Sequence, residues 1–208
     1  MKNLVPSPRW YIDQENPFTL GLLKLRNPSN IENTSPFGIS IFDGSGNEKI
    51  GEVNGLVYAA SPGSLENVEI FPENYKTSAL VPYEFSFETK NQLDAGSDIE
   101  IIVPTDIELN KDTMKVTIQT TDGSQRNITP QVTNNVILLP DFFNVDLTEP
   151  TQVRFKFDTG FKNADSTNRI NPIVIRTRDS VGSIIDQGDS NSITFTANKI
   201  KDIIVDPE

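Results

Sequence analysis

The stretch VPYEFSFE at residues 81–88 decides the fold class, because its side chains alternate strictly. Its apolar members, Val81, Tyr83, Phe85 and Phe87, fall on one face of an extended strand. Such alternation predicts a strand with one buried face and one solvated face. Sheets built from strands of this kind are normally antiparallel.

The same period of two recurs along the chain and predicts more strands. The alternation is equally clear in Met114–Gln119 and Val153–Asp158. Shorter apolar runs predict strands at 18–25, 37–41, 55–60, 99–103, 136–139, 173–177, 192–197 and 203–205. Thr120–Ser124 contains an Asp-Gly turn dipeptide and predicts a hairpin. No stretch has the apolar period of a helix, so we expect an all-β, antiparallel β-sandwich, with a β-barrel as the alternative.

An internal similarity links residues 26–50 to residues 162–186. Aligned without a gap, five positions agree in residue type: Asn27 with Asn163, Pro36 with Pro172, Ile39 with Ile175, Asp43 with Asp179, and Gly46 with Gly182. After one deletion, Leu65, Val68 and Ile70 fall on Ile200, Ile203 and Val205, and Pro72-Glu73 falls on Pro207-Glu208. The order predicts a tandem repeat of about 135 residues. The alternative is that two similar edge hairpins have been aligned.

The repeat predicts about one and a half β-sandwich units. Residues 1–65 form the second half of one unit, residues 66–200 form a complete unit, and residues 201–208 form a linker strand to a following unit. A few strands with one apolar face cannot bury that face alone. A neighbouring unit or chain would then supply the missing strands by β-augmentation. Alternatively, the first 65 residues belong to one larger sandwich.

The composition excludes several classes of function. Among 208 residues, 18 basic and 29 acidic side chains give a net charge of −11. This charge argues against nucleic-acid binding and against docking on anionic lipid. The absence of Cys and His excludes thiolate nucleophiles, Ser-His-Asp triads and nearly all zinc or copper sites.

The chain therefore carries no catalytic signature, and we expect a protein that is not an enzyme, with no catalytic residue and no cofactor. No apolar run approaches the roughly 20 residues of a membrane span, so we expect no direct membrane insertion. Residues 1–8 lack the apolar region of a signal peptide.

Some residues are candidates for ligand binding. Asp43, Asn47 and Glu48 concentrate oxygen donors of the kind that Ca²⁺ takes. The alternative is turn chemistry, in which Asp and Asn side chains bond to their own backbone. Trp10 and Tyr11 could stack on a carbohydrate, or they could pack the N-terminal segment on the sandwich.

Two asparagines begin glycosylation sequons, Asn33 and Asn127. Both lie near predicted turns or strand edges, where a glycan can be accommodated. They are informative only if the protein is secreted.

A set of turn and strand-edge motifs resembles the tandem immunoglobulin-like or fibronectin-type-III-like repeats of large surface proteins of protists such as ciliates. The motifs are Asn27–Ser29, Thr34–Phe37, Ile39–Gly46, Pro62–Leu65, Tyr83–Phe87 and Gly96–Pro104. The resemblance implies an extracellular, structural or adhesive role with no catalytic residues. We therefore expect a surface or filament module that self-associates or joins neighbouring units through its strands. The alternative is a single carbohydrate- or calcium-binding β-sandwich.

Overall fold

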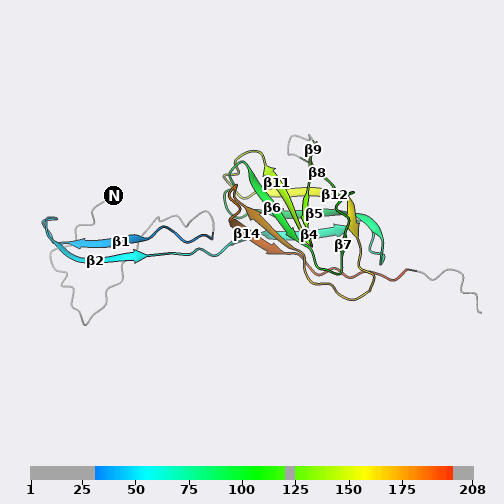
Figure 1. Ribbon diagram of the computed structural model, residues 1–208, viewed down its shortest axis with the longest axis horizontal. Coiled ribbons are helices and arrows are strands. Elements are labelled where there is room, and N and C mark those ends of the chain that lie inside the picture. The colour runs from blue at the N-terminus through cyan, green and yellow to red at the C-terminus, as the bar shows by residue number, and fades with distance from the viewer. Residues whose placement is uncertain (1–30, 120–124, 199–208) are drawn as a thin grey trace, which may run out of the picture. The chain divides into compact units, whose positions relative to one another are not determined.

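The computed structural model describes residues 31–119 and 125–198, which form strands and turns (Figure 1). The described chain divides into two compact units. The first contains residues 32–60, and the second contains residue 31 and the described residues from Ser61 onward. The described part of the chain forms no helix of the length and apolarity that crossing a membrane requires.

The strands of the described residues are β1 (Phe37–Phe42), β2 (Lys49–Leu56), β3 (Gly63–Ser64), β4 (Glu66–Pro72), β5 (Leu80–Glu88), β6 (Ser97–Ile102), β7 (Glu108–Leu109), β8 (Lys115–Gln119), β9 (Gln125–Ile128), β10 (Gln131–Thr133), β11 (Val136–Phe143), β12 (Gln152–Lys162), β13 (Val174–Arg178) and β14 (Ile184–Asp189). The first unit is the β1–β2 hairpin, and we call the second unit the body.

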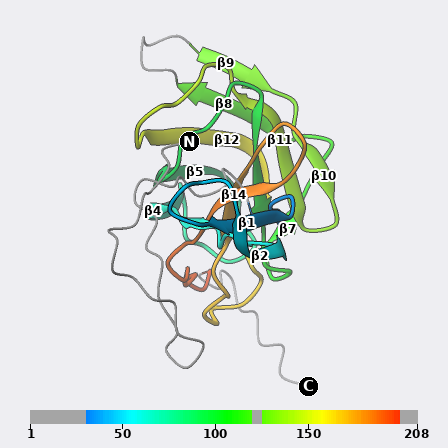
Figure 2. The ribbon, with the colours of Figure 1, turned by 90° about the vertical axis from the view of Figure 1, so that its left-hand side faces the viewer.

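The body is a sandwich of two sheets. One sheet has the order β10-β11-β6-β13-β14-β3, and the other has the order β4-β5-β12-β8-β9, with β7 also pairing with β12. Figure 2 shows β8, β9 and β12 side by side in the second sheet. Every strand pair is antiparallel except the short β14–β3 pair. The predicted all-β, sandwich-like architecture is confirmed; the tandem arrangement stays a prediction.

The alternating stretch 81–88, which lies in β5, forms the centre of the core. β5 pairs with β12 in a register that sets Phe85 opposite Phe155. These two rings stack with their centroids 5.1 Å apart, and Phe157 meets Phe85 edge-on at 5.3 Å. All three rings are at most 2% exposed. Aromatic pairs of this geometry add about 0.5–1.5 kcal/mol to the burial of their area.

A buried amide joins the core to the loop after β4. The Tyr83 hydroxyl donates a 2.7 Å hydrogen bond to Oδ1 of Asn163. Asn163 Nδ2 donates to the carbonyl oxygens of Asn74 and Lys76, each at 2.7 Å. Burial of the phenol raises the pKa of Tyr83. Asn163 is 1% exposed, so its hydrogen bonds are made out of reach of bulk water.

The structure differs from the sequence expectation at several boundaries. The division between the units follows Ala60, whereas the sequence predicted it after residue 65. The physical reason is that Leu65 is 7% exposed and its amide bonds to the Gln187 carbonyl, both within the body. The predicted complete unit begins at residue 66, which is the first residue of β4, and β4 pairs with β5 in the body.

Two predicted strands are displaced or replaced. The run at 55–60 predicted a strand, whereas the observed strand, β2, lies earlier and ends at Leu56. Gly55 has a φ of 74°, which departs from extended geometry next to this end. The run at 192–197 forms isolated bridges, Arg169 with Thr194 and Lys76 with Thr196. The predicted strands at 18–25 and 203–205 lie outside the described residues. The predicted hairpin around 120–124 is confirmed, because β8 and β9 pair antiparallel.

Candidate assembly surface

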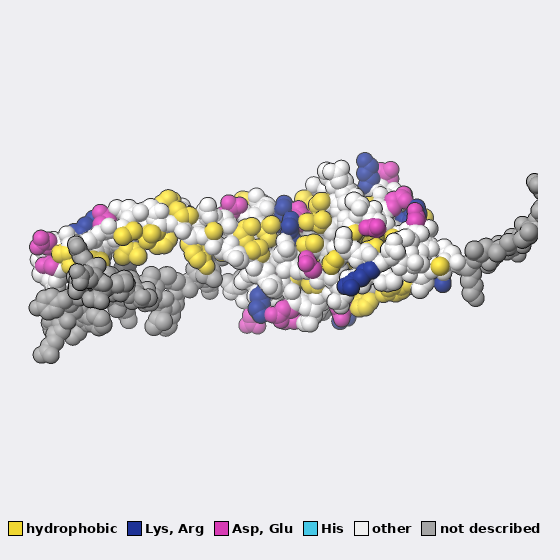
Figure 3. Space-filling view, turned by 90° about the horizontal axis from the view of Figure 1, so that it is seen from below, with side chains coloured by type: hydrophobic (Ala, Val, Ile, Leu, Met, Phe, Trp, Pro, Cys, Tyr) yellow, Lys and Arg dark blue, Asp and Glu magenta, His cyan; other side chains and the backbone are white. Residues whose placement is uncertain are grey.

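The β1–β2 hairpin has one polar face and one apolar face. On the polar face, the Ser40 hydroxyl bonds to Glu52 at 3.3 Å, and Lys49 Nζ lies 2.7 Å from the same carboxylate. The hydrogen bond from Lys49 lowers the pKa of Glu52. The opposite face carries apolar side chains in exposed or half-buried positions: Phe37, Ile39, Ile41, Ile50 and Val53. Figure 3 shows hydrophobic side chains at the surface along the hairpin.

The strand register of this hairpin is repeated by β13–β14 of the body. Corresponding residues differ by 136 between β1 and β13, and by 135 between β2 and β14. Four cross-strand pairs of the hairpin match four of the body: Ile39↔Val53 with Ile175↔Gly188, Ser40↔Glu52 with Arg176↔Gln187, Ile41↔Gly51 with Thr177↔Asp186, and Phe42↔Lys49 with Arg178↔Ile184. Both hairpins also shift register between the third and the fourth pair. The single gap of the sequence alignment therefore lies in the turn.

The turns of the two hairpins share the same hydrogen bonds. The Gly46 amide donates to the Asp43 carbonyl at 3.0 Å, and the Gly182 amide donates to the Asp179 carbonyl at 2.9 Å. Both glycines have positive φ, 76° and 90°. Each aspartate Oδ1 accepts a backbone amide four residues later, at 3.0 Å in the hairpin and 2.8 Å in the body.

The correspondence extends past the strand ends. The Thr34 amide donates to the Tyr58 carbonyl at 2.9 Å. At the matching positions, the Ile170 amide donates to the Ile193 carbonyl at 3.2 Å. The two hairpins thus share their pairing at these positions, while β1–β2 has one further register shift, between Phe37 and Ile39, that β13–β14 lacks.

The two hairpins differ in what covers them. In the body, β13 pairs on its outer side with β6, setting Ile175 opposite Ile101 and Thr177 opposite Ile99. Among the described residues, β1 pairs with β2 alone. The body hairpin therefore buries its inner face in the core, whereas the inner face of β1–β2 stays at the surface. We call this inner face, made by Phe37, Ile39, Ile41, Ile50 and Val53, the apolar face of the hairpin.

The predicted calcium ligands lie in the turn of this hairpin. The Asp43 carboxylate accepts the Ser45 hydroxyl at 2.6 and 2.8 Å and the backbone amides of Asn47 and Glu48 at 3.0 and 3.1 Å. The bond from Ser45, followed by that from Glu48, lowers the pKa of Asp43. Within 31–119 and 125–198, no three acidic side chains gather in a group that could hold a metal. A calcium site here stays a prediction.

The other predicted site residues are dispersed. Asn33 precedes β1 and is exposed. Asn127 lies exposed on β9, where its side chain accepts the Thr117 hydroxyl at 3.4 Å. Trp10 and Tyr11 lie outside the described residues. Of the two described asparagines, Asn33 therefore belongs to the first unit and Asn127 to the body.

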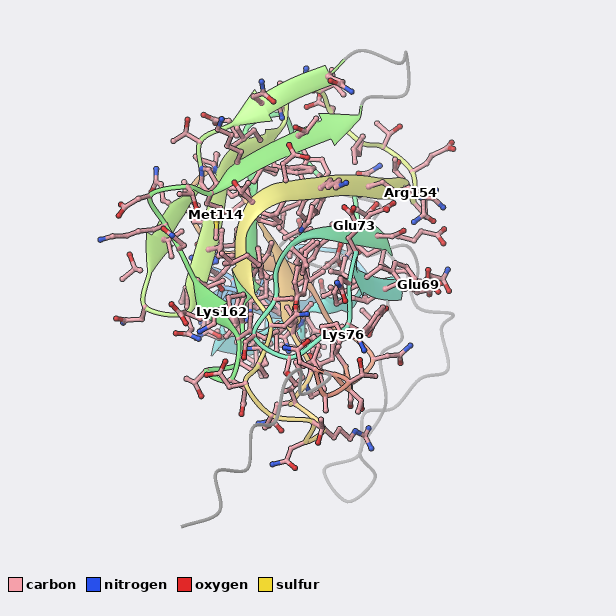
Figure 4. The ribbon with its side chains drawn as sticks, turned by 90° about the vertical axis from the view of Figure 1, so that its right-hand side faces the viewer. Glu69, Glu73, Lys76, Met114, Arg154 and Lys162 are labelled. Carbon is pink, nitrogen blue, oxygen red and sulfur yellow. The ribbon has the colours of Figure 1, made fainter. Side chains whose placement is uncertain are left out.

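Two of the hollows at the surface of the body are lined by described residues. One, of about 310 Å³, is lined by residues 108–112 with Val132 and Asn134. The other, of about 120 Å³, lies over β4 and β5, next to the Lys156–Glu73 ion pair at 3.3 Å. Figure 4 shows Glu69, Glu73 and Arg154 projecting from the outer face of this sheet. Neither lining includes a buried polar atom left without a partner in the described residues, so neither hollow shows chemistry that converges on a ligand.

No protein-family model and no curated protein matches the chain. Among solved structures, the bacterial hydrophobin BslA is 14% identical, with 68% of this chain and 100% of BslA aligned at a TM-score of 0.42. A collagen-binding domain from a Staphylococcus aureus adhesin is 8% identical, with 61% and 96% aligned at 0.38. A type II cohesin domain from the cellulosome of Acetivibrio cellulolyticus is 8% identical, with 65% and 92% aligned at 0.24. The chain thus has a distant structural similarity to bacterial β-sandwich modules, with no family identified, and the resemblance to protist surface repeats stays a prediction.

Proposed function

We propose that this chain is a structural module of an extracellular array of β-sandwiches, in which the β1–β2 hairpin completes the sheet of a neighbouring sandwich. The observation that carries the proposal is the register that β1–β2 and β13–β14 share at four cross-strand pairs, combined with their opposite burial. The function is mechanical and adhesive, and the partner is another sandwich unit.

The apolar face supplies the driving force for this assembly. Ile50 is 59% exposed and Val53 is 54% exposed, and fully burying one such side chain contributes about 1.5–3 kcal/mol. An isolated two-stranded hairpin is at best marginally stable in water. Docking would bury the apolar face and extend the pairing of β1 beyond β2.

The free edge of β1 supplies the geometry. In the body, the corresponding edge of β13 pairs with β6 from Asp98 to Ile102. A neighbouring sandwich with an open edge at its β6 position would pair with β1 in the same register, by strand addition. The net charge of −11 keeps the remaining surfaces from associating without specificity.

The experiment is negative-stain electron microscopy of the protein in its native assembly, with two matched variants. Ile50→Asp places a charge on the apolar face. Val181→Asp makes the same kind of change in the turn of the body hairpin, where Val181 is 82% exposed. We expect beaded rods from the unsubstituted protein and from Val181→Asp, and separated particles from Ile50→Asp. Rods that persist in Ile50→Asp, or single compact particles from the unsubstituted protein, would overturn the proposal.

A further inference from the structure

We infer that the sandwich which accepts β1–β2 is not a second copy of this chain's body, but a β-sandwich of the same topology with different residues facing the hairpin. This inference rests on the proposed function and specifies its partner. It follows from the positions at which β1–β2 and β13–β14 differ, because the body shows what its own sheet requires there.

At the first such position, the hairpin has Val53 where the body has Gly188. A Cβ atom added to Gly188 would lie 2.8 Å from both Leu65 Cβ and Val68 Cγ2. Real Cβ atoms essentially never come that close, and valine would bring two further methyl groups. The body therefore has no room for Val53, and the accepting sandwich has smaller side chains at the positions of Leu65 and Val68.

At the second position, the hairpin has Gly51 where the body has Asp186. Asp186 is fully buried, and its carboxylate accepts the Asn91 side-chain amide at 2.7 Å and the Asn91 backbone amide at 3.2 Å. The Lys90 amide lies 3.4 Å from the same carboxylate. With glycine in place of Asp186, these donors would lose their acceptor, which costs about 1–3 kcal/mol for each buried group. The accepting sandwich therefore has no loop that requires a carboxylate at this position.

At the third position, the hairpin has Ile41 where the body has Thr177. Thr177 is fully buried, and its hydroxyl accepts the Asp186 amide at 3.0 Å. Isoleucine would remove this acceptor and add volume to a filled site, and overpacking typically costs about 1–3 kcal/mol. The polar pair of Thr177 and Asp186 in the body thus corresponds to the apolar pair of Ile41 and Gly51 in the hairpin.

The outer face of the sheet adds two more differences. Glu100 on β6 is 8% exposed and bonds to Arg176 at 3.1 Å and to Arg178 at 3.0 Å. The hairpin has Ser40 and Phe42 at these positions. A buried carboxylate that loses both cationic partners is strongly destabilised. The accepting sandwich therefore carries a neutral side chain at the position of Glu100.

Together these five positions let the body take its own hairpin and reject β1–β2. Copies of this chain therefore do not exchange hairpins with one another. The chemistry of the accepting unit follows from these positions. It has small residues opposite Val53, and opposite Gly51 it has no loop whose amides donate to a carboxylate. It has no buried charge opposite Ser40 and Phe42. An array built this way has a fixed order of units, because repulsive differences exclude the wrong neighbour.

Two chimeras of the full chain test the inference. In the first, residues 37–54 replace residues 173–189 of the body. The second carries the same graft, with the body's residues restored at the five positions: Ser40→Arg, Ile41→Thr, Phe42→Arg, Gly51→Asp and Val53→Gly. Both keep the original β1–β2 hairpin, and cooperative unfolding in urea is measured for each.

We expect the first chimera to lose the cooperative transition and the second to recover it, with a midpoint near that of the unmodified chain. If both chimeras unfold cooperatively at that midpoint, the exclusion of a second copy is overturned while the equivalence of the hairpins stands. If neither folds, the equivalence itself fails, and with it the proposed function. The two failures are therefore distinguishable.

Discussion

Ile50 and Ile185 occupy the same position in two hairpins of identical register, yet Ile50 is 59% exposed and Ile185 is 4% exposed. Each isoleucine lies at the register shift of its hairpin. Ile50 lies between the paired residues Lys49 and Gly51, and Ile185 lies between the paired residues Ile184 and Asp186. The residue type and the neighbouring strand pairs are alike, so the difference comes from the surroundings. Ile185 packs in the core of the body, and the described residues form no such core around Ile50.

Replacing these two isoleucines by alanine separates the two environments. Ile185→Ala leaves a cavity in the core and is expected to lower the free energy of unfolding of the body by about 2–5 kcal/mol. Ile50→Ala is expected to change it by less than about 0.5 kcal/mol, as exposed substitutions usually do. Urea unfolding of the isolated chain measures both. Equal losses in the two variants would contradict the assignment of Ile50 to a surface.

Gly188 tests the fit of the body to its own hairpin. Gly188→Ala places a methyl group 2.8 Å from Leu65 and Val68, so it is expected to destabilise the body by about 1–3 kcal/mol. Gly44 is the control, because an added Cβ there meets nothing within 4 Å. Thermal unfolding compares the two variants. A Gly188→Ala variant as stable as Gly44→Ala would show that β4 has room to move, and would remove the steric part of the selectivity.

Asn163 tests the buried amide between the core and the loop after β4. Asn163→Ala leaves the Tyr83 hydroxyl and two backbone carbonyls without their partner, and each unsatisfied buried group costs about 1–3 kcal/mol. The exposed Asn168 provides a control of the same residue type. Chemical unfolding is expected to show a large loss for Asn163→Ala and none for Asn168→Ala. Similar midpoints for the two variants would contradict the role given to this amide.

Tyr83 predicts an alkaline limit to stability. Its pKa in the folded chain is raised above the ordinary value of 10.0, because burial disfavours the phenolate. The folded state therefore holds the proton more tightly, so this contribution is fully present below pH 10 and is lost as the pH rises above it. One such group changes the free energy of unfolding by at most about 1.4 kcal/mol per pH unit.

Unfolding measured between pH 9 and pH 11.5 checks this slope. Tyr83→Phe lacks the ionisable group, so its stability is expected to fall less steeply in this range, even though its stability at neutral pH is lower through loss of the bond to Asn163. Identical slopes for the two proteins would mean that Tyr83 does not cause the alkaline loss.

Much of the body could be predicted from the sequence, because local alternation decides which side chains are buried. β5, β8 and β12 each alternate clearly, and each supplies the core as expected. β2 was missed over residues 49–54 because Gly51, Glu52 and Asn54 are poor strand formers. Its extended geometry comes from pairing with β1, which a local pattern does not reveal.

The candidate site was only partly predictable. The similarity between residues 26–50 and 162–186 indicated related hairpins, and four cross-strand pairs of the two hairpins share the same register. The selectivity could not be predicted, because it depends on contacts between distant parts of the chain. Gly188 meets Leu65, and Asp186 meets Asn91, only after the sheets have assembled.

Asp43 shows the limit of reasoning from residue types. Its oxygens predicted a calcium ligand, which stays a prediction, and in the described structure they accept hydrogen bonds from Ser45 and from the backbone of the turn. Aspartate serves both roles with the same atoms, so spacing alone does not separate them. Its counterpart Asp179 makes the same backbone bond in the body, which marks the residue as part of the turn.

The central claim is that the apolar face of β1–β2 docks on a neighbouring sandwich, and photocrosslinking from position 50 tests it most directly. A diazirine-bearing aliphatic amino acid replaces Ile50 in the native assembly, and Val181, which is 82% exposed in the turn of the body hairpin, provides the control position. We predict that position 50 crosslinks to a strand peptide from outside residues 1–208, and that position 181 does not. Crosslinks from position 50 that fall only on peptides of this chain, or yields no higher than those from position 181, would contradict the claim.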